Sequence, residues 1–319
     1  MAIHSSRRQF LGRGAVLAAT AGFGQLAESA RAEEAAAKPY HFSYGLNTGT
    51  IRGYKLGLAE QIDVAAKAGY EGIEPWTSDV AKFAQGGGSL KDLGKKCRDQ
   101  GLKVYGGIGF AQWAVDDDAQ RAKGVESLKR EMDQLAEMGG THIAAPPSGV
   151  TKAGTKLDLN RAGERYRAIL EVGRQIGVIP QLEIWGASAN LGNLAEACFV
   201  AARAGHPDAC ILSDVFHMYK GGSDPASLCL LGRKAVHCIH MNDYPASPDR
   251  QTIGDANRIW PGDGIAPLKQ ILTALADNCC NVMLSIELFN AEYWKLPVAE
   301  TAATGLAKMK AAVKAAGLV

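Results

Sequence analysis

The sequence of 319 residues lacks any apolar run long enough to cross a bilayer, which takes about 20 consecutive residues. It also lacks an excess of charge of one sign, because 35 lysines and arginines balance 33 aspartates and glutamates. No basic run stands out, and this argues against a nucleic-acid partner. Hydrophobic residues make up 47% of the chain, which is enough to bury one large core.

Two common motifs are missing as well. The seven cysteines are scattered and form no C-x-x-C pair, so a disulfide framework is not expected. Those inside apolar segments should pack as small hydrophobic residues. No G-x-G-x-x-G follows a first strand, and Gly86-Gly87-Gly88 is too isolated to indicate a phosphate loop.

The first 32 residues resemble a twin-arginine export signal. Arg7 and Arg8 precede a weakly apolar stretch, and Ala30-Arg31-Ala32 then offers small residues to a signal peptidase. We expect residues 1–32 to be removed and residues 33–319 to form one domain. That domain would leave the cytoplasm already folded, through the twin-arginine export machinery, and would be periplasmic or secreted. The alternative is a frayed, alanine-rich N-terminal helix.

From residue 40 onward, short apolar runs alternate with amphipathic helical runs. The apolar runs lack a strict in–out alternation, which is typical of parallel strands covered on both faces. The expected strands are Phe42–Leu46, Gly72–Pro75, Lys103–Gly107, His142–Ala145, Ile179–Ile184, Cys210–Asp214, Val236–Met241 and Val282–Glu287. The expected helices include Leu58–Ala68, Ala119–Met138, Arg161–Ile176, Leu194–Arg203, Pro267–Ala276 and Val298–Ala315.

These eight units predict a single α/β domain, a (β/α)8 TIM barrel. Glycines such as Gly139 and Gly177 follow helical runs, where a helix C-cap is expected. The connections are short, and the size suits a closed barrel. A doubly wound open sheet is the main alternative.

Four consecutive expected strands each carry an ionisable residue at or next to their carboxyl end. Because catalytic groups of such barrels gather at the carboxyl ends of the strands, these side chains should converge. Three carboxylates and one imidazole would repel one another or remain desolvated without a cation, and together they suit Mn²⁺, Mg²⁺, Co²⁺ or Zn²⁺. Each residue taken alone has an ordinary structural explanation, such as a cap or a salt bridge. The four residues are Glu183, Asp214, His240 and Glu287.

The motifs around these residues resemble the sugar phosphate isomerase/epimerase superfamily, which comprises xylose-isomerase-like or AP-endonuclease-2-type barrels. The motifs are Leu182-Glu183, Ser213-Asp214-Val215-Phe216-His217, His240-Met241-Asn242-Asp243, Pro261-Gly262-Asp263-Gly264 and Ile286-Glu287. The similarity covers the chain from about Phe42. It implies one divalent metal ion held by Glu183, Asp214, His240 and Glu287, with Glu183 and Glu287 also exchanging protons with the substrate.

The same resemblance implies that His217 and Arg258 bind substrate. A solvent-facing histidine at a helix start and an ordinary loop arginine are the alternatives. Trp113 and Trp185 lie just past strand ends, where an indole could stack on the apolar face of a sugar, or simply pack against the core.

The expected reaction is isomerisation or epimerisation of a sugar, keto-sugar or polyol through a metal-stabilised enediolate. A dehydratase or β-eliminating lyase acting on a keto-sugar or keto-glycoside shares the first proton abstraction and stays open. So does a non-catalytic, exported sugar-binding barrel. An endonuclease is disfavoured by the seven histidines and the missing basic face. Residues 186–190 lack the second carboxylate that epimerases of this superfamily often carry there, which weakens a ketose-epimerase assignment. A homo-oligomer is compatible with this sequence, whereas membrane insertion is not expected.

Overall fold

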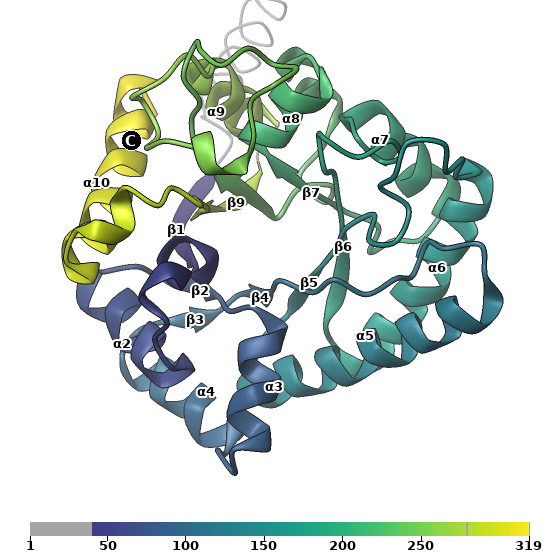
Figure 1. The fold of residues 1–319 in the computed structure, drawn as a ribbon, viewed down its shortest axis with the longest axis horizontal. Helices are drawn as coiled ribbons and strands as arrows, with labels where there is room; N and C mark the ends of the chain where they lie inside the picture. Colours follow the sequence, from purple (N-terminus) through teal and green to yellow (C-terminus); the bar gives the residue numbers. More distant parts are fainter. Residues whose placement is uncertain (1–39, 279, 319) are drawn as a thin grey trace, which may run out of the picture. The chain divides into compact units, whose positions relative to one another are not determined.

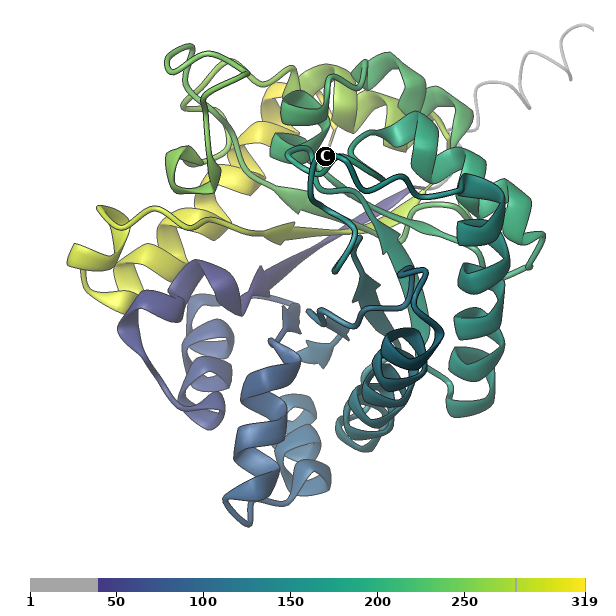
Figure 2. The same ribbon diagram turned by 45° about the vertical axis from the view of Figure 1, so that its right-hand side comes forward.

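The computed structural model describes residues 40–278 and 280–318, so the predicted leader 1–32 lies outside the described residues. Within the described part, nine parallel strands form one sheet in the order β3-β2-β1-β9-β8-β7-β6-β5-β4. Figures 1 and 2 show them at the centre of a ring of helices. The strands are β1 (His41–Asn47), β2 (Gly72–Glu74), β3 (Lys103–Val104), β4 (Gly106–Gly107), β5 (His142–Ala145), β6 (Ile179–Glu183), β7 (Ile211–Asp214), β8 (Cys238–Met241) and β9 (Asn281–Ile286).

The two ends of this sheet meet at Tyr105, which alone separates β3 from β4. The Tyr105 N–H donates to the Ile73 carbonyl, in β2, at 3.1 Å. On the other side, the Tyr105 carbonyl accepts from Thr141 and His142, at 3.1 and 3.2 Å. β3 and β4 are therefore two halves of the predicted strand Lys103–Gly107, and the eight-stranded (β/α)8 barrel is confirmed.

Helices follow most strands and pack outside them, as predicted. Gly139 and Gly177 end α5 and α6 with φ values of 88° and 89°, which are left-handed conformations that favour glycine. The connection from β2 to β3 holds two helices, α3 and α4. The α-helices are α2 (Leu58–Ala68), α3 (Thr77–Gln85), α4 (Leu90–Asp99), α5 (Asp118–Met138), α6 (Leu159–Ile176), α7 (Leu194–Ala204), α8 (Val215–Gly221), α9 (Leu268–Asp277) and α10 (Val298–Ala315). Short 3₁₀ helices are η1 (Thr48–Tyr54), η2 (Pro225–Leu230), η3 (Asp255–Asn257) and η4 (Tyr293–Lys295).

Burial on both faces of the strands explains their apolar sequences. Every residue of β7 and β8 is buried, and so is every residue of β9 except Asn281. Polar side chains nevertheless occur on these strands, and Asp214, His240 and Ser285 share one face of the sheet by register. Among the described residues, no helix has the length and apolar character that a membrane span requires.

Candidate metal centre

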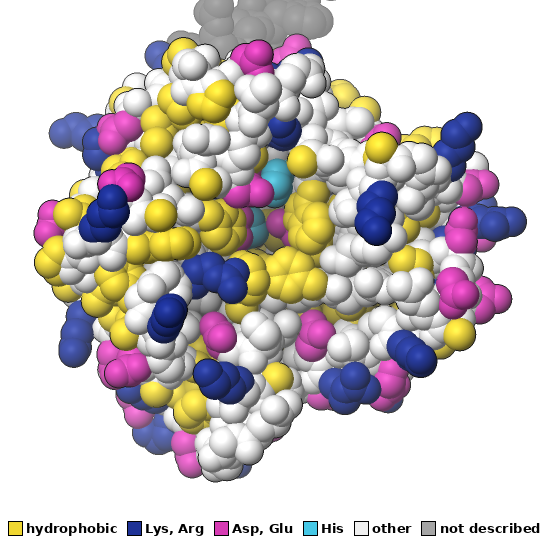
Figure 3. Space-filling view, viewed as in Figure 1, with side chains coloured by type: hydrophobic (Ala, Val, Ile, Leu, Met, Phe, Trp, Pro, Cys, Tyr) yellow, Lys and Arg dark blue, Asp and Glu magenta, His cyan; other side chains and the backbone are white. Residues whose placement is uncertain are grey.

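Four acidic or histidine side chains meet where β6, β7, β8 and β9 end. Glu183 and Asp214 are the last residues of β6 and β7, and Glu287 directly follows β9. His240 lies in β8, opposite Asp214 in the parallel register. All four are at least 96% buried. Figure 3 shows the hollow at the barrel axis, with histidine and acidic atoms at its base.

The Nδ1 atom of His240 is the centre of this group. It lies 3.2 Å from Glu287 Oε2 and 3.6 Å from Asp214 Oδ2, and the donor atoms of these three residues lie within 4.8 Å of one another. Glu183 Oε1 is 3.9 Å from the same nitrogen. Nitrogen and oxygen ligands about 2.1 Å from a tetrahedral zinc are about 3.4 Å apart, so the spacing fits one shared cation. The structure thus brings together the four predicted ligands.

The buried atoms of the cluster also leave hydrogen-bonding capacity unused. His240 Nδ1 and Glu183 Oε2 have no hydrogen-bond partner among the described residues. A buried polar atom without a partner costs free energy, and a cation bound to His240 Nδ1 would remove that cost for the imidazole. The residues present therefore fit a divalent metal.

Arg258 lies against the same carboxylates. Its Nη1 donates to Asp214 Oδ2 and to Glu287 Oε2, both at 2.9 Å, and Asp255 accepts from Nε at 3.1 Å and from Nη2 at 2.6 Å. The guanidinium is 1% exposed and lies over the ring of Phe216. Arg258, predicted to bind substrate, therefore also balances the charge of two predicted metal ligands.

His217 is held by this arginine. Its Nε2 lies 3.0 Å from Arg258 Nη2, and because a guanidinium can only donate, Nε2 accepts and Nδ1 carries the proton. Burial lowers the pKa of His217, which favours this neutral form. Nδ1 has no partner among the described residues, so it is a donor available to a ligand oxygen, as the substrate-binding prediction requires.

The pKa values of the carboxyl groups are pushed in different directions. Burial raises the pKa of Glu183 to about 8, with His240 opposing the shift and Glu287 adding to it. Burial also disfavours ionisation of Asp214 and Glu287, but the nearby cations hold the pKa of both carboxyls below the usual range. Burial disfavours the charge on His240 too, yet the carboxylates around it raise its pKa well above the ordinary value.

The two predicted tryptophans have different surroundings. Trp185 is half-buried, and its ring centroid lies 6.0 Å from that of Phe110, which in turn lies 4.8 Å from Trp76. Trp113, by contrast, is fully buried and donates from Nε1 to the Pro146 carbonyl at 2.9 Å. The prediction that Trp113 stacks on substrate is corrected, because its indole has no exposed face.

Two contacts of the cluster were not expected from sequence. Glu74 ends β2, and its Oε2 lies 3.4 Å from His240 Nε2. Asn47 ends β1 and donates from Nδ2 to Glu287 Oε1 at 2.8 Å. The available indication was position, since both residues lie at or next to the carboxyl end of an expected strand, as the four predicted ligands do.

The Asp243 carboxylate fixes the backbone of the Pro-Gly-Asp-Gly motif, residues 261–264, through hydrogen bonds. Its Oδ1 accepts from Tyr244 and Ala266, at 2.7 and 2.8 Å, and its Oδ2 accepts from Gly262 and Gly264, at 3.0 and 3.1 Å. Asp243 also pairs with Ile259 in an antiparallel bridge. The buried carboxylate thus holds the loop that carries Arg258.

Replacing Asp243 with asparagine should lower the free energy of unfolding by about 3 kcal/mol. The amide keeps one oxygen but turns the other acceptor into a donor facing two backbone N–H groups, and hydrogen bonds to charged acceptors contribute about 1.5–3 kcal/mol each. Asp263→Asn is the control on the same loop, because Asp263 pairs with Lys308 near the surface and should cost less than about 1 kcal/mol. Urea denaturation measures both, and equal losses would contradict this role of Asp243.

Comparison with known proteins agrees with this fold. The sequence profile described as "Xylose isomerase-like TIM barrel" matches residues 62–312. An inosose isomerase of Bacillus velezensis is 25% identical over 80% of this chain and 92% of its own length. A 3-dehydroshikimate dehydratase of Pseudomonas aeruginosa is 25% identical over 78% of this chain, which spans 39% of that protein. The crystal structure of IOLI protein with a binding zinc atom superposes with a TM-score of 0.78 at 22% identity, covering 86% of this chain and 98% of that one. The chain belongs to the xylose isomerase-like TIM barrel family.

Proposed function

We propose that this protein is a divalent-metal-dependent enzyme that isomerises or epimerises a keto-sugar or keto-polyol by moving a proton beside a carbonyl group. The observation that carries the proposal is the convergence of Glu183, Asp214 and Glu287 on Nδ1 of His240 at the carboxyl ends of the strands. A similar zinc-containing barrel and the relative named inosose isomerase support this metal and substrate class.

A divalent cation held there would supply Lewis-acid polarisation of a substrate carbonyl, which makes the proton on the neighbouring carbon easier to remove. We assign the ligand role to Glu183, Asp214, His240 and Glu287, with zinc as the favoured metal.

Within this site, Glu183 is the better-placed proton carrier. Both oxygens of Glu287 already accept hydrogen bonds, from Asn47 and Arg258, whereas Glu183 Oε2 has no such partner among the described residues. A general base must reach the proton with a free lone pair. Glu287, which is fixed by these two hydrogen bonds, contributes negative charge on the other side of the site.

The substrate would be oriented by donors and by aromatic faces. His217 Nδ1 offers an N–H group to its oxygens, and the Arg258 guanidinium, whose N–H groups are taken up by protein acceptors, holds His217 in that orientation. Trp185 and Phe110 lie with Trp76 in a chain of ring contacts, and such faces stack on the C–H surface of a sugar. These contacts suit a cyclic polyol with one carbonyl.

A dehydratase is the second candidate, because the relative in Pseudomonas aeruginosa is a 3-dehydroshikimate dehydratase. Loss of water from the enediolate and its reprotonation begin with the same proton abstraction. We also propose that residues 1–32 are a twin-arginine leader and that the barrel of residues 33–319 acts in the periplasm or outside the cell.

The test combines metal analysis with proton exchange. The purified barrel should contain one divalent cation per chain, and it should exchange solvent deuterium into inosose at the carbon beside the carbonyl. Loss of water from 3-dehydroshikimate instead of exchange into inosose would select the dehydratase. If the protein binds the cation and the sugar but catalyses neither reaction, it is a non-catalytic binding barrel, and the proposal that it is an enzyme is refuted.

A further inference from the structure

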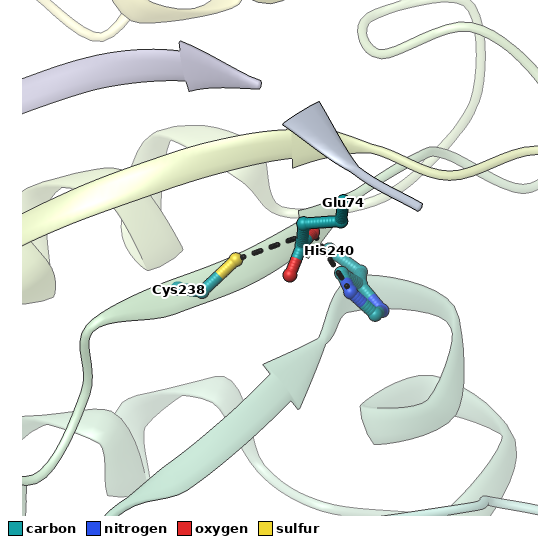
Figure 4. A group of neighbouring side chains, drawn as sticks. All are labelled: Glu74, Cys238 and His240. Atoms are coloured by element: carbon teal, nitrogen blue, oxygen red, sulfur yellow. Dashed lines mark hydrogen bonds and ion pairs between the residues drawn. The ribbon is translucent and has the colours of Figure 1, made fainter. Parts of the chain in front are cut away.

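The imidazole of His240 faces carboxylates through both of its ring nitrogens. Nδ1 faces the proposed cation site, whereas Nε2 lies 3.4 Å from Oε2 of Glu74 on the opposite side of the ring (Figure 4). The Glu74 and His240 side chains are 1% and 0% exposed. Solvent water therefore cannot readily form a hydrogen bond with either side chain.

The Glu74 carboxylate also contacts a second residue of β8, the strand that carries His240. The Cys238 thiol donates to Glu74 Oε2 at 3.7 Å. Cys238 and His240 are two residues apart on β8, so both side chains point to the same face of the strand, where Glu74 reaches them from β2. This contact crosses the barrel interior, because β1 and β9 lie between β2 and β8 in the sheet.

The Nε2 atom of His240 needs an acceptor. It forms no hydrogen bond of good geometry within residues 40–278 and 280–318, and the carboxylate oxygen that lies near it is Glu74 Oε2, at 3.4 Å. An imidazole that binds a metal through one nitrogen must carry its proton on the other, and a carboxylate accepting that N–H fixes both the tautomer and the ring orientation.

We infer that Glu74 is a positioning residue that accepts the Nε2–H of His240 and thereby presents the Nδ1 lone pair to the cation. The inference rests on the proposed metal centre and adds a residue to it. Glu74 acts through His240 and touches neither cation nor substrate. A second cation bound by Glu74, Cys238 and His240 is the competing explanation, since their donor atoms lie within 4.8 Å of one another.

Titration of the metal-free protein with Co²⁺ tests the inference. Glu74→Ala should weaken Co²⁺ binding by about 10–100-fold, the usual loss when such an outer partner is removed. Glu74→Gln keeps the volume and one acceptor oxygen, so most of the affinity should return. Glu131→Ala and Glu131→Gln are matched controls, because Glu131 on α5 is a half-buried glutamate whose Oε2 also has no partner among the described residues. They should leave Co²⁺ affinity unchanged.

Proton NMR of the Co²⁺-loaded protein supplies a readout that a purely structural role would not move. One exchangeable imidazole N–H shifted by the paramagnetic ion is expected from His240, and it should shift or broaden in Glu74→Ala. If that variant does not fold, Glu74→Asp replaces it, because the shorter side chain retains the charge but withdraws the carboxylate from Nε2.

The outcomes separate the two proposals. Unchanged Co²⁺ affinity and an unchanged N–H resonance in Glu74→Ala would refute the positioning role and leave the metal centre standing. Two bound cations in the wild type, with one lost in the variant, would make Glu74 a ligand and overturn the inference. A wild-type protein that binds no Co²⁺ would remove the metal centre and the inference together.

Discussion

Replacing Glu183 with glutamine is expected to slow deuterium exchange into inosose by 10²- to 10⁴-fold, the usual contribution of a general base. Glutamine preserves the shape of the side chain but has no basic oxygen at the position of the unpartnered Oε2. Asp214, His240 and Glu287 still offer one cation three donors within 4.8 Å of one another. Exchange measured at saturating metal therefore reports the loss of the base.

The same change at Glu287 would be harder to interpret. Its two oxygens accept from Asn47 and Arg258, so an amide there would place its NH₂ group against one of these donors. Glu131→Gln is the matched control for Glu183→Gln, because it removes a half-buried carboxylate outside the site. Exchange retained at the wild-type rate in Glu183→Gln would exclude it as the base.

Replacing Arg258 with methionine should lower the free energy of unfolding of the metal-free protein by about 3–5 kcal/mol, because removing one partner of a buried ion pair leaves uncompensated charge. Burial opposes the arginine's charge, but Asp214, Glu287 and Asp255 hold its pKa above the usual value, so the guanidinium stays charged. Saturating Zn²⁺ should recover part of the loss, since the cation would neutralise Asp214 and Glu287 in place of the guanidinium. Urea denaturation with and without Zn²⁺ measures both effects.

Arg174→Met is the comparison for Arg258→Met. Arg174 pairs with Asp208 at 2.8 Å, and both side chains are substantially exposed to solvent. The expected loss there is below about 1 kcal/mol, with no dependence on Zn²⁺. An equal loss in the two variants, or an Arg258→Met protein indifferent to Zn²⁺, would show that the guanidinium does not balance the cluster.

The barrel and the convergence of the four side chains predicted as ligands could be anticipated, because strand ends are visible in sequence. Apolar runs ending in Glu183, Asp214 and Glu287 predicted both the strands and the edge where their side chains meet, as the fold subsequently showed. This prediction needs only the order of the strands along the chain, because the carboxyl ends of all parallel strands in a closed barrel lie at the same end of the barrel.

Glu74 shows where this reasoning stops. It also ends a strand, but β2 has three residues and carries no histidine or aspartate motif nearby. Its approach to His240 depends on how far each strand is staggered around the barrel, which local patterns do not encode. Trp113 was misjudged for a related reason: position just past a strand end does not indicate that its indole turns inward to Pro146.

The residues of the metal site come from both ends of the barrel sequence, from Asn47 and Glu74 to Glu287. Asn47 binds Glu287 across the seam between the first and last strands, so the complete set of contacts forms only after the ring has closed. Uptake of the proposed cation would therefore be coupled to completion of folding. We propose that the chain is exported after it has folded. In that case the metal ions of the cytoplasm, where the chain is made, would determine which ion the enzyme carries. The metal ions of the compartment to which it is exported would not.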